Sequence, residues 1–132
     1  MSLDRFLQAQ EKTYAGALAE LKAGKKTGHW IWWIFPQLRG LGTSHNSTYY
    51  GLADEAEARA YLEHPILGAR YRECVAVAHE QVCLRKIDPH TLMGSDIDVV
   101  KLCSSLKLLR KGTSTDEAVF DCQLGETLKA LD

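Results

Sequence analysis

The sequence lacks the short motifs that identify most metal sites, phosphate loops and serine nucleophiles. Its five histidines show neither HxxxH nor HExxH spacing, and its four cysteines include no Cys-x-x-Cys pair. Gly40-Leu41-Gly42 lacks both the third glycine of a dinucleotide fingerprint and the lysine of a phosphate-binding loop. No Gly-x-Ser-x-Gly elbow is present. We therefore expect no metal ion and no cofactor.

An excess of one charge and a long apolar run are also missing. The 16 basic and 17 acidic residues give a net charge of −1, without the surplus of Lys and Arg that contacts to nucleic-acid phosphates require. No apolar run reaches the roughly 18 residues that span a bilayer. The first residues do not form a basic-then-apolar leader. We expect a cytoplasmic protein with neither a nucleic-acid partner nor a membrane partner.

What the sequence does contain is helical periodicity. Its 132 residues, 45% of them hydrophobic, suit a single domain over residues 1–132. Apolar residues recur at spacings of three and four, while alternation and Asn-Gly or Asp-Gly turns are absent. The pattern predicts an all-α fold, a single compact multi-helix domain of about six or seven helices. The alternative is a small hairpin built from residues 30–35 and 49–53.

In the N-terminal half, one apolar stripe predicts a helix over residues 3–23 with Gly24 as its stop. Residues 30–35 are rich in β-branched and aromatic side chains, which favours a strand. The helix-rich surroundings favour a short helix instead, and Pro36 ends either element. Residues 40–51 are predicted to form a polar loop.

Capping signals define the later helices. Asp54 opens one helix, and Ser95 opens another that ends at Gly112. Ser114 is followed three residues later by a glutamate, which predicts a capping box. The short helix that follows is expected to stop at Gly125.

Residues 28–37 are the most distinctive stretch, because they hold all three tryptophans of the chain. On a helix, Trp30 and Trp33 share a face and Trp32 diverges from it. Tryptophan faces stack on nucleobases or flavin-like rings for ~1–3 kcal/mol each, but they also serve as plain core residues. Aromatic walls with a few directed polar groups are typical of small-ligand pockets. Trp30 and Trp33 are therefore candidate ligand contacts.

Polar side chains flank this stretch. His29 can transfer a proton near neutral pH, or it can be a structural residue. The Gln37 amide can recognise a ligand or satisfy loop backbone groups. Ser44 and Tyr50 lie on a glycine-containing loop that could cradle a phosphate or simply connect two elements. We take His29 as a candidate catalytic residue and the other three as candidate ligand contacts.

A third candidate is the helix that begins after Ser95. Asp98, Lys101 and Ser105 lie at spacings of three and four and share a face. A partly buried lysine with a lowered pKa can attack a carbonyl or a sugar, and Asp98 would adjust its protonation. The other interpretation is a surface ion pair on a polar face. Lys101 and Asp98 are therefore candidate catalytic residues, and Ser105 is a candidate ligand contact.

The order of these residues resembles the signature of a bacterial family of unknown function, whose members sometimes carry the label calpastatin. Residues 29–38 read HWIWWIFPQL and are followed by Gly40-Leu41-Gly42 and Ser44. The resemblance spans nearly the whole chain. It implies an all-α fold and brings no established catalytic activity. Nothing in the chain is similar to a calpain inhibitor, which would be disordered and repetitive.

A fainter resemblance links the chain to N-glycosidases that act on ADP-ribose conjugates and on riboflavin-pathway intermediates. It rests on Tyr61, Leu67-Gly68 and Arg70, followed by Lys101. In that family a lysine attacks the anomeric carbon of the sugar. The resemblance implies that Lys101 is a nucleophile, that Asp98 or His29 handles protons, and that the tryptophans stack a base.

Two functions follow from these observations. The first is a pocket for a nucleotide-like small molecule, with N-glycosidic hydrolysis as its reaction if the protein is an enzyme. The second is a non-catalytic helical module that binds a protein partner. A pocket requires Lys101 beside residues 30–37 in a concave site, whereas an interaction module predicts a flat apolar patch with Lys101 in open solvent.

Overall fold

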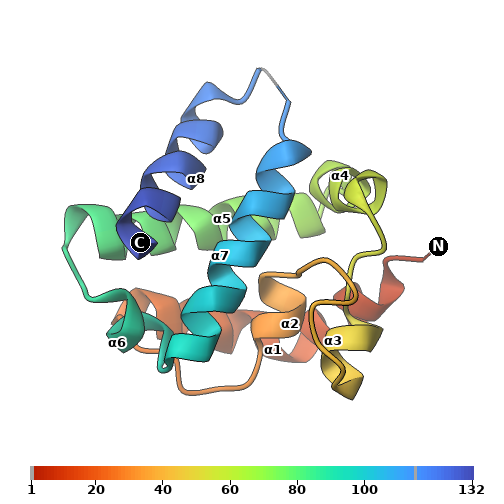
Figure 1. The fold of residues 1–132 in the computed structure, drawn as a ribbon, viewed down its shortest axis with the longest axis horizontal. Helices are drawn as coiled ribbons and strands as arrows, with labels where there is room; N and C mark the ends of the chain where they lie inside the picture. The colour runs from red at the N-terminus through yellow and green to blue at the C-terminus, as the bar shows by residue number, and fades with distance from the viewer. Residues whose placement is uncertain (1, 115) are drawn as a thin grey trace.

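The computed structural model describes residues 2–114 and 116–132, and every regular element in this part is helical (Figure 1). The all-α prediction is confirmed, with eight α-helices and one π-helical segment among the described residues rather than six or seven helices. None of these helices is long and apolar enough to cross a membrane. The elements are α1 (Asp4–Ala23), α2 (Ile31–Ile34), α3 (His45–Tyr49), α4 (Glu55–Glu63), α5 (Leu67–His79), η1 (Glu80–Leu84), α6 (Pro89–Met93), α7 (Asp96–Lys111) and α8 (Ala118–Leu131).

Helix α1 is the longest element and forms because its apolar residues share one face. Phe6, Ala17 and Leu21 are buried on that face. The helix ends at Gly24, whose φ of 82° lies in the left-handed region that a glycine adopts without strain. The predicted stop at Gly24 is confirmed.

The long helices α5 and α7 organise the rest of the molecule. Helix α5 packs against α1, α4 and α8, and α7 packs against α2, α4, α6 and α8. Helices α4 and α8 therefore contact both long helices. Helix α2 lies beside the N-terminal half of α7, and α3 lies on the far side of α2 (Figure 1). This arrangement creates the candidate site.

Four fully buried aromatic rings hold the centre of the core together. Phe6 meets Tyr61 edge-on at 5.1 Å between ring centroids, and Tyr61 meets Tyr71 edge-on at 6.0 Å. Phe35 also packs edge-on against Tyr71, at 5.9 Å. Edge-to-face pairs contribute about 0.5–1.5 kcal/mol each beyond burial of their area. Phe35 thereby anchors the end of the tryptophan segment to α5.

The connection after the tryptophan segment differs from both predictions made for it. The hairpin is wrong: an isolated parallel bridge joins Leu38 to Leu52, with hydrogen bonds of 2.7 Å (Arg39 N to Leu52 O) and 2.8 Å (Leu52 N to Gln37 O). The polar loop contains a short helix, α3, because the Ser44 side chain caps it by accepting from the Ser47 N–H at 3.2 Å. The bridge closes the base of this segment.

The C-terminal helix is longer than predicted, and the predicted capping box is wrong. Helix α8 runs without interruption through Gly125. A Cβ at Gly125 would lie 2.9 Å from the Arg110 guanidinium, so this glycine admits a close interhelical contact instead of stopping a helix. Glu117 binds Arg72, with N–O distances of 2.6 and 3.1 Å, and does not complete a cap. Long-range packing decided both positions.

Candidate functional site

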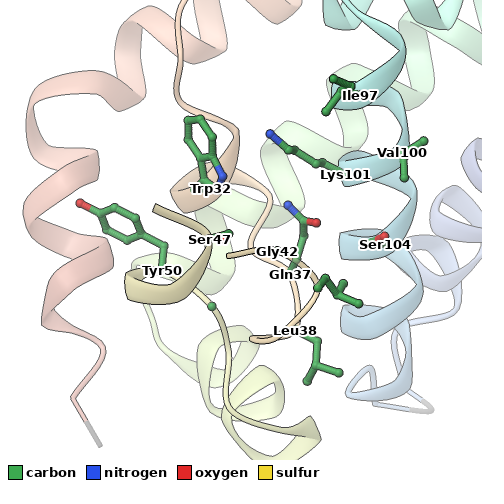
Figure 2. A pocket seen from close by; sticks show the side chains of 12 residues that line it. Trp32, Gln37, Leu38, Gly42, Ser47, Tyr50, Ile97, Val100, Lys101 and Ser104 are labelled. Atoms are coloured by element: carbon green, nitrogen blue, oxygen red, sulfur yellow. The ribbon is translucent and has the colours of Figure 1, made fainter. Parts of the chain in front are cut away.

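A cavity of about 400 Å³ lies between the α2–α3 region and the N-terminal half of α7 (Figure 2). This volume falls within the range of small-molecule pockets. One wall comes from α2, α3 and the segment between them, and the other comes from successive turns of α7. The lining residues are mostly apolar, with a few polar groups: Trp32, Gln37, Leu38, Leu41, Gly42, Ser47, Tyr50, Gly51, Ile97, Val100, Lys101 and Ser104.

Lys101 links the two walls. Its Nζ lies 4.4 Å from the centroid of the Trp32 ring, and Figure 2 shows the side chain reaching from α7 towards that indole. Nζ is also 3.7 Å from Asp98 Oδ1, and the Lys101 side chain is 24% exposed. The ammonium group therefore contacts an aromatic face and stays partly exposed, so a ligand in the cavity can reach it.

A second lysine contacts the same carboxylate from the other side. Lys26 Nζ lies 2.7 Å from Asp98 Oδ2, and its side chain is 5% exposed. It also donates to Gly28 O at 2.5 Å and lies 5.0 Å from the Trp30 ring centroid. Two ammonium groups thus share one carboxylate. The cluster carries one positive charge in excess, and it faces the cavity through Lys101.

Gln37 and Leu38 owe their positions to the parallel bridge. Because Gln37 O accepts from Leu52 N, the backbone here is fixed and the Gln37 amide projects between Trp32 and α7 (Figure 2). Tyr50 lines the cavity from the end of α3, and its ring packs against Trp33 at 5.0 Å and against Phe6 at 6.0 Å. Burial, and then the neighbouring Tyr49, raises the pKa of Tyr50. Figure 2 shows the Tyr50 hydroxyl pointing away from Lys101 and Gln37, towards α1.

Two of the three tryptophans lie outside the cavity. Trp30 is 3% exposed, and its indole N–H donates to Glu20 Oε1 at 2.9 Å. Trp33 is half-buried and donates to Thr13 Oγ1 at 2.8 Å. Both indoles face α1, on the shared face that their spacing predicts, and neither lines the cavity. The diverging Trp32 supplies the aromatic wall of the cavity.

Two predicted hydroxyl contacts also lie elsewhere. Ser44 caps α3 and does not line the cavity. Ser105 is fully buried, with its hydroxyl 3.0 Å from that of Tyr71. Ser105 lies on the buried face of α7, so the preceding residue, Ser104, lines the cavity instead. Ser47 is the α3 hydroxyl that reaches the cavity.

His29 is exposed and lines a second, smaller cavity together with Asp98 and Lys101. The predicted catalytic residues are therefore close together in space, although His29 precedes α2 and the other two are on α7. Sequence reasoning did not single out Lys26. No local signal connects Lys26 with Asp98, because the pair is 72 positions apart in the chain.

In the part of the chain that the structure describes, no cysteine lines the cavity. Burial raises the pKa of Cys74 to about 12, so this thiol stays protonated at neutral pH. Among the described residues, no group of three or more His, Cys, Asp or Glu side chains is arranged to hold a metal ion. Lys101 lines both cavities, and Asp98 lines the smaller one beside it.

Comparisons with known proteins agree with the fold. Residues 1–130 match a family model described as "Protein of unknown function (DUF1810)". The chain is similar to the crystal structure of the conserved hypothetical protein Rv1873 from Mycobacterium tuberculosis, at 37% sequence identity and a TM-score of 0.85, over 98% of this chain and 89% of that one. A search of curated proteins found no significant match. The chain therefore belongs to the DUF1810 family of proteins of unknown function.

Proposed function

We propose that the cavity between α2 and α7 binds a nucleotide-like small molecule, with an aromatic ring against the apolar walls and an anionic group at Lys101. The observation that carries this proposal is the Lys101 ammonium group, which lies on the Trp32 indole inside a concave site. A cation fixed on an aromatic face offers both stacking and charge to one ligand.

The charges around Asp98 support an anionic ligand. The carboxylate is 2.7 Å from the buried Lys26 but 3.7 Å from Lys101, so Lys26 is its closer partner. Because Lys26 balances the charge of Asp98, the charge of Lys101 is left for a ligand. Hydrogen bonds to charged groups contribute about 1.5–3 kcal/mol, enough to select an anion over a neutral analogue.

The remaining walls suit a flat ring. Leu38, Leu41, Ile97 and Val100 line the cavity and expose between 38% and 67% of their surface. A ring placed among them would cover this apolar surface, at roughly 25 cal/mol for each Å² removed from water. The Gln37 side chain extends towards Lys101 (Figure 2), and its amide can pair with ring nitrogen and oxygen atoms.

The same exposed aliphatic residues are also the best argument for a protein-binding module. A protein partner would need them on a flat patch with Lys101 in open solvent. Lys101 instead has a largely buried side chain and lines a concave site beside Trp32. This placement favours a small-molecule ligand.

N-glycosidic hydrolysis is a second candidate, favoured by the contact between Lys101 and Asp98. Asp98 would take a proton from the ammonium, and the free amine would attack the anomeric carbon of the ligand. The carbon–nitrogen bond to the base would break, with His29 or the protonated Asp98 giving a proton to the leaving base. Water would then release the sugar from Lys101.

Ligand binding can be tested by a thermal-shift screen of mononucleotides, NAD, ADP-ribose and flavin precursors, with titration of any hit by tryptophan fluorescence. We expect Lys101→Ala to weaken binding about ten- to a hundredfold, because it removes one charge-assisted contact. Lys107→Ala is the matched control, since Lys107 is exposed on the same helix and lines neither cavity. The absence of any shift in the unaltered protein would contradict the proposal, and so would undiminished binding by Lys101→Ala.

A further inference from the structure

A second cavity of about 330 Å³ adjoins the first. The two share three lining residues: Trp32 from α2, and Ile97 and Lys101 from α7. They therefore meet along the line where the Lys101 side chain crosses from α7 to the Trp32 indole. One boundary between them is a lysine side chain with four rotatable carbon–carbon bonds, which can move aside for a ligand.

The two cavities differ in chemistry. The larger one is lined mainly by aliphatic and aromatic side chains, with Lys101 at its edge. The smaller one is lined by His29, Thr27, Ser95 and Asp98 together with both lysines of the charge cluster. His29 and Thr27 are exposed there, and both carry hydrogen-bonding groups that can reach a ligand.

The charges that face the smaller cavity favour an anion as well. Lys26 and Lys101 both contact Asp98, at 2.7 and 3.7 Å, which leaves one positive charge in excess. His29 is exposed and adds a ring N–H donor. A phosphate placed between His29 and Lys101 would meet two donors from different elements, and its charge would balance the excess.

We infer that the two cavities are the two halves of one site and that the ligand has two parts. This inference rests on the proposed function. The aromatic ring occupies the larger cavity against Trp32 and Val100. The sugar-phosphate part passes Lys101 and ends in the smaller cavity, where His29 is a specificity-determining contact. The favoured ligand class is therefore a ring joined to a phosphorylated sugar, rather than a free base or a free sugar phosphate.

The test compares whole and divided ligands by isothermal titration. The probes are two mononucleotides (one with adenine, one with uracil), the two free bases, and ribose 5-phosphate. We expect a mononucleotide to bind at least tenfold more tightly than either of its parts. We also expect a base and ribose 5-phosphate to bind together without competing.

Two variants separate the halves. His29→Ala should weaken the binding of ribose 5-phosphate and of the mononucleotide about tenfold and leave binding of the free base unchanged. Val100→Ala should weaken binding of the base and of the mononucleotide only. His45→Ala is the matched histidine control, because His45 is exposed on α3 and lines neither cavity.

The outcomes distinguish this inference from the function on which it rests. If a mononucleotide binds in a Lys101-dependent manner but His29→Ala has no effect, or if the base and ribose 5-phosphate compete, the two-part site is wrong and the larger cavity alone is the binding site. If no probe binds to the unaltered protein, the proposed function is wrong, and the two-part site is wrong with it.

Discussion

On the side of the tryptophan segment that faces α1, the Trp30 and Trp33 indoles donate to Glu20 and Thr13. On the side that faces α7, the Trp32 ring meets the Lys101 ammonium group and lines both cavities. Adjacent residues of one type thus divide between a hydrogen-bonded interior and an open wall. The comparison teaches that an indole with a hydrogen-bond partner in the interior serves the fold, whereas the Trp32 indole lines open space beside a partly exposed cation.

The largest expected difference between the two sides concerns the indoles themselves. Trp30→Ala should lower the free energy of unfolding by about 3–5 kcal/mol, because it leaves a cavity in the core and removes a donor from Glu20. Trp32→Ala should lower it by only about 1 kcal/mol, since Trp32 is half-buried and lines open space. Urea denaturation followed by circular dichroism measures both. An equal loss of unfolding free energy for the two substitutions would contradict the distinction between the α1 side and the α7 side.

The second prediction concerns the two lysines that share Asp98. Lys26→Ala should cost about 3 kcal/mol, because Asp98 is 15% exposed and would lose its closer partner. Lys101→Ala, on the other side of the same carboxylate, should cost less than about 1 kcal/mol, since its contacts are longer and its side chain is more exposed. Lys25→Ala, at an exposed neighbouring position, is the control for helix-end effects. If Lys101→Ala lowered the free energy of unfolding more than Lys26→Ala, Lys101 and not Lys26 would be the main partner of Asp98.

The smallest expected effect is the pH dependence that Glu20 contributes on the α1 side. Burial alone would raise the pKa of Glu20, but hydrogen bonds from the Gly28 and Thr27 N–H groups and the Trp30 indole lower it to about 2. Because the folded pKa lies below the unfolded value of about 4.5, the stabilisation is fully present above pH 4.5. It is lost as the pH falls from there towards 2.

Glu20→Gln should therefore lower the free energy of unfolding by about 1–2 kcal/mol at pH 7, after allowance for the partial exposure of this side chain. The variant and the unaltered protein should converge in stability as the pH approaches 2. Glu11→Gln, an exposed change on the same helix, is the control. A constant difference between pH 7 and pH 2 would show that the carboxylate charge plays no part.

Part of the candidate site was predictable from the sequence. The Ser95 cap forms as predicted, with Ser95 Oγ accepting from the Asp98 N–H at 3.1 Å, so the spacing of Asp98 and Lys101 on α7 followed from helical geometry alone. The divergence of Trp32 from the other indoles followed in the same way. The sequence could not show whether the Trp30–Trp33 face or the Trp32 face would border a cavity, because that depends on where α1 and α7 pack.

Local chemistry within the sequence determined the elements: the spacing of apolar residues, the capping serine and aspartate residues, and the glycine at position 24 act over a few residues and need no distant partner. Tertiary packing decided the rest. The pairing of Lys26 with Asp98, the burial of Ser105 against Tyr71 and the continuation of α8 through Gly125 each depend on residues far apart in the chain. Burial and charge pairing depend on distances in space, and only the folded chain sets those distances.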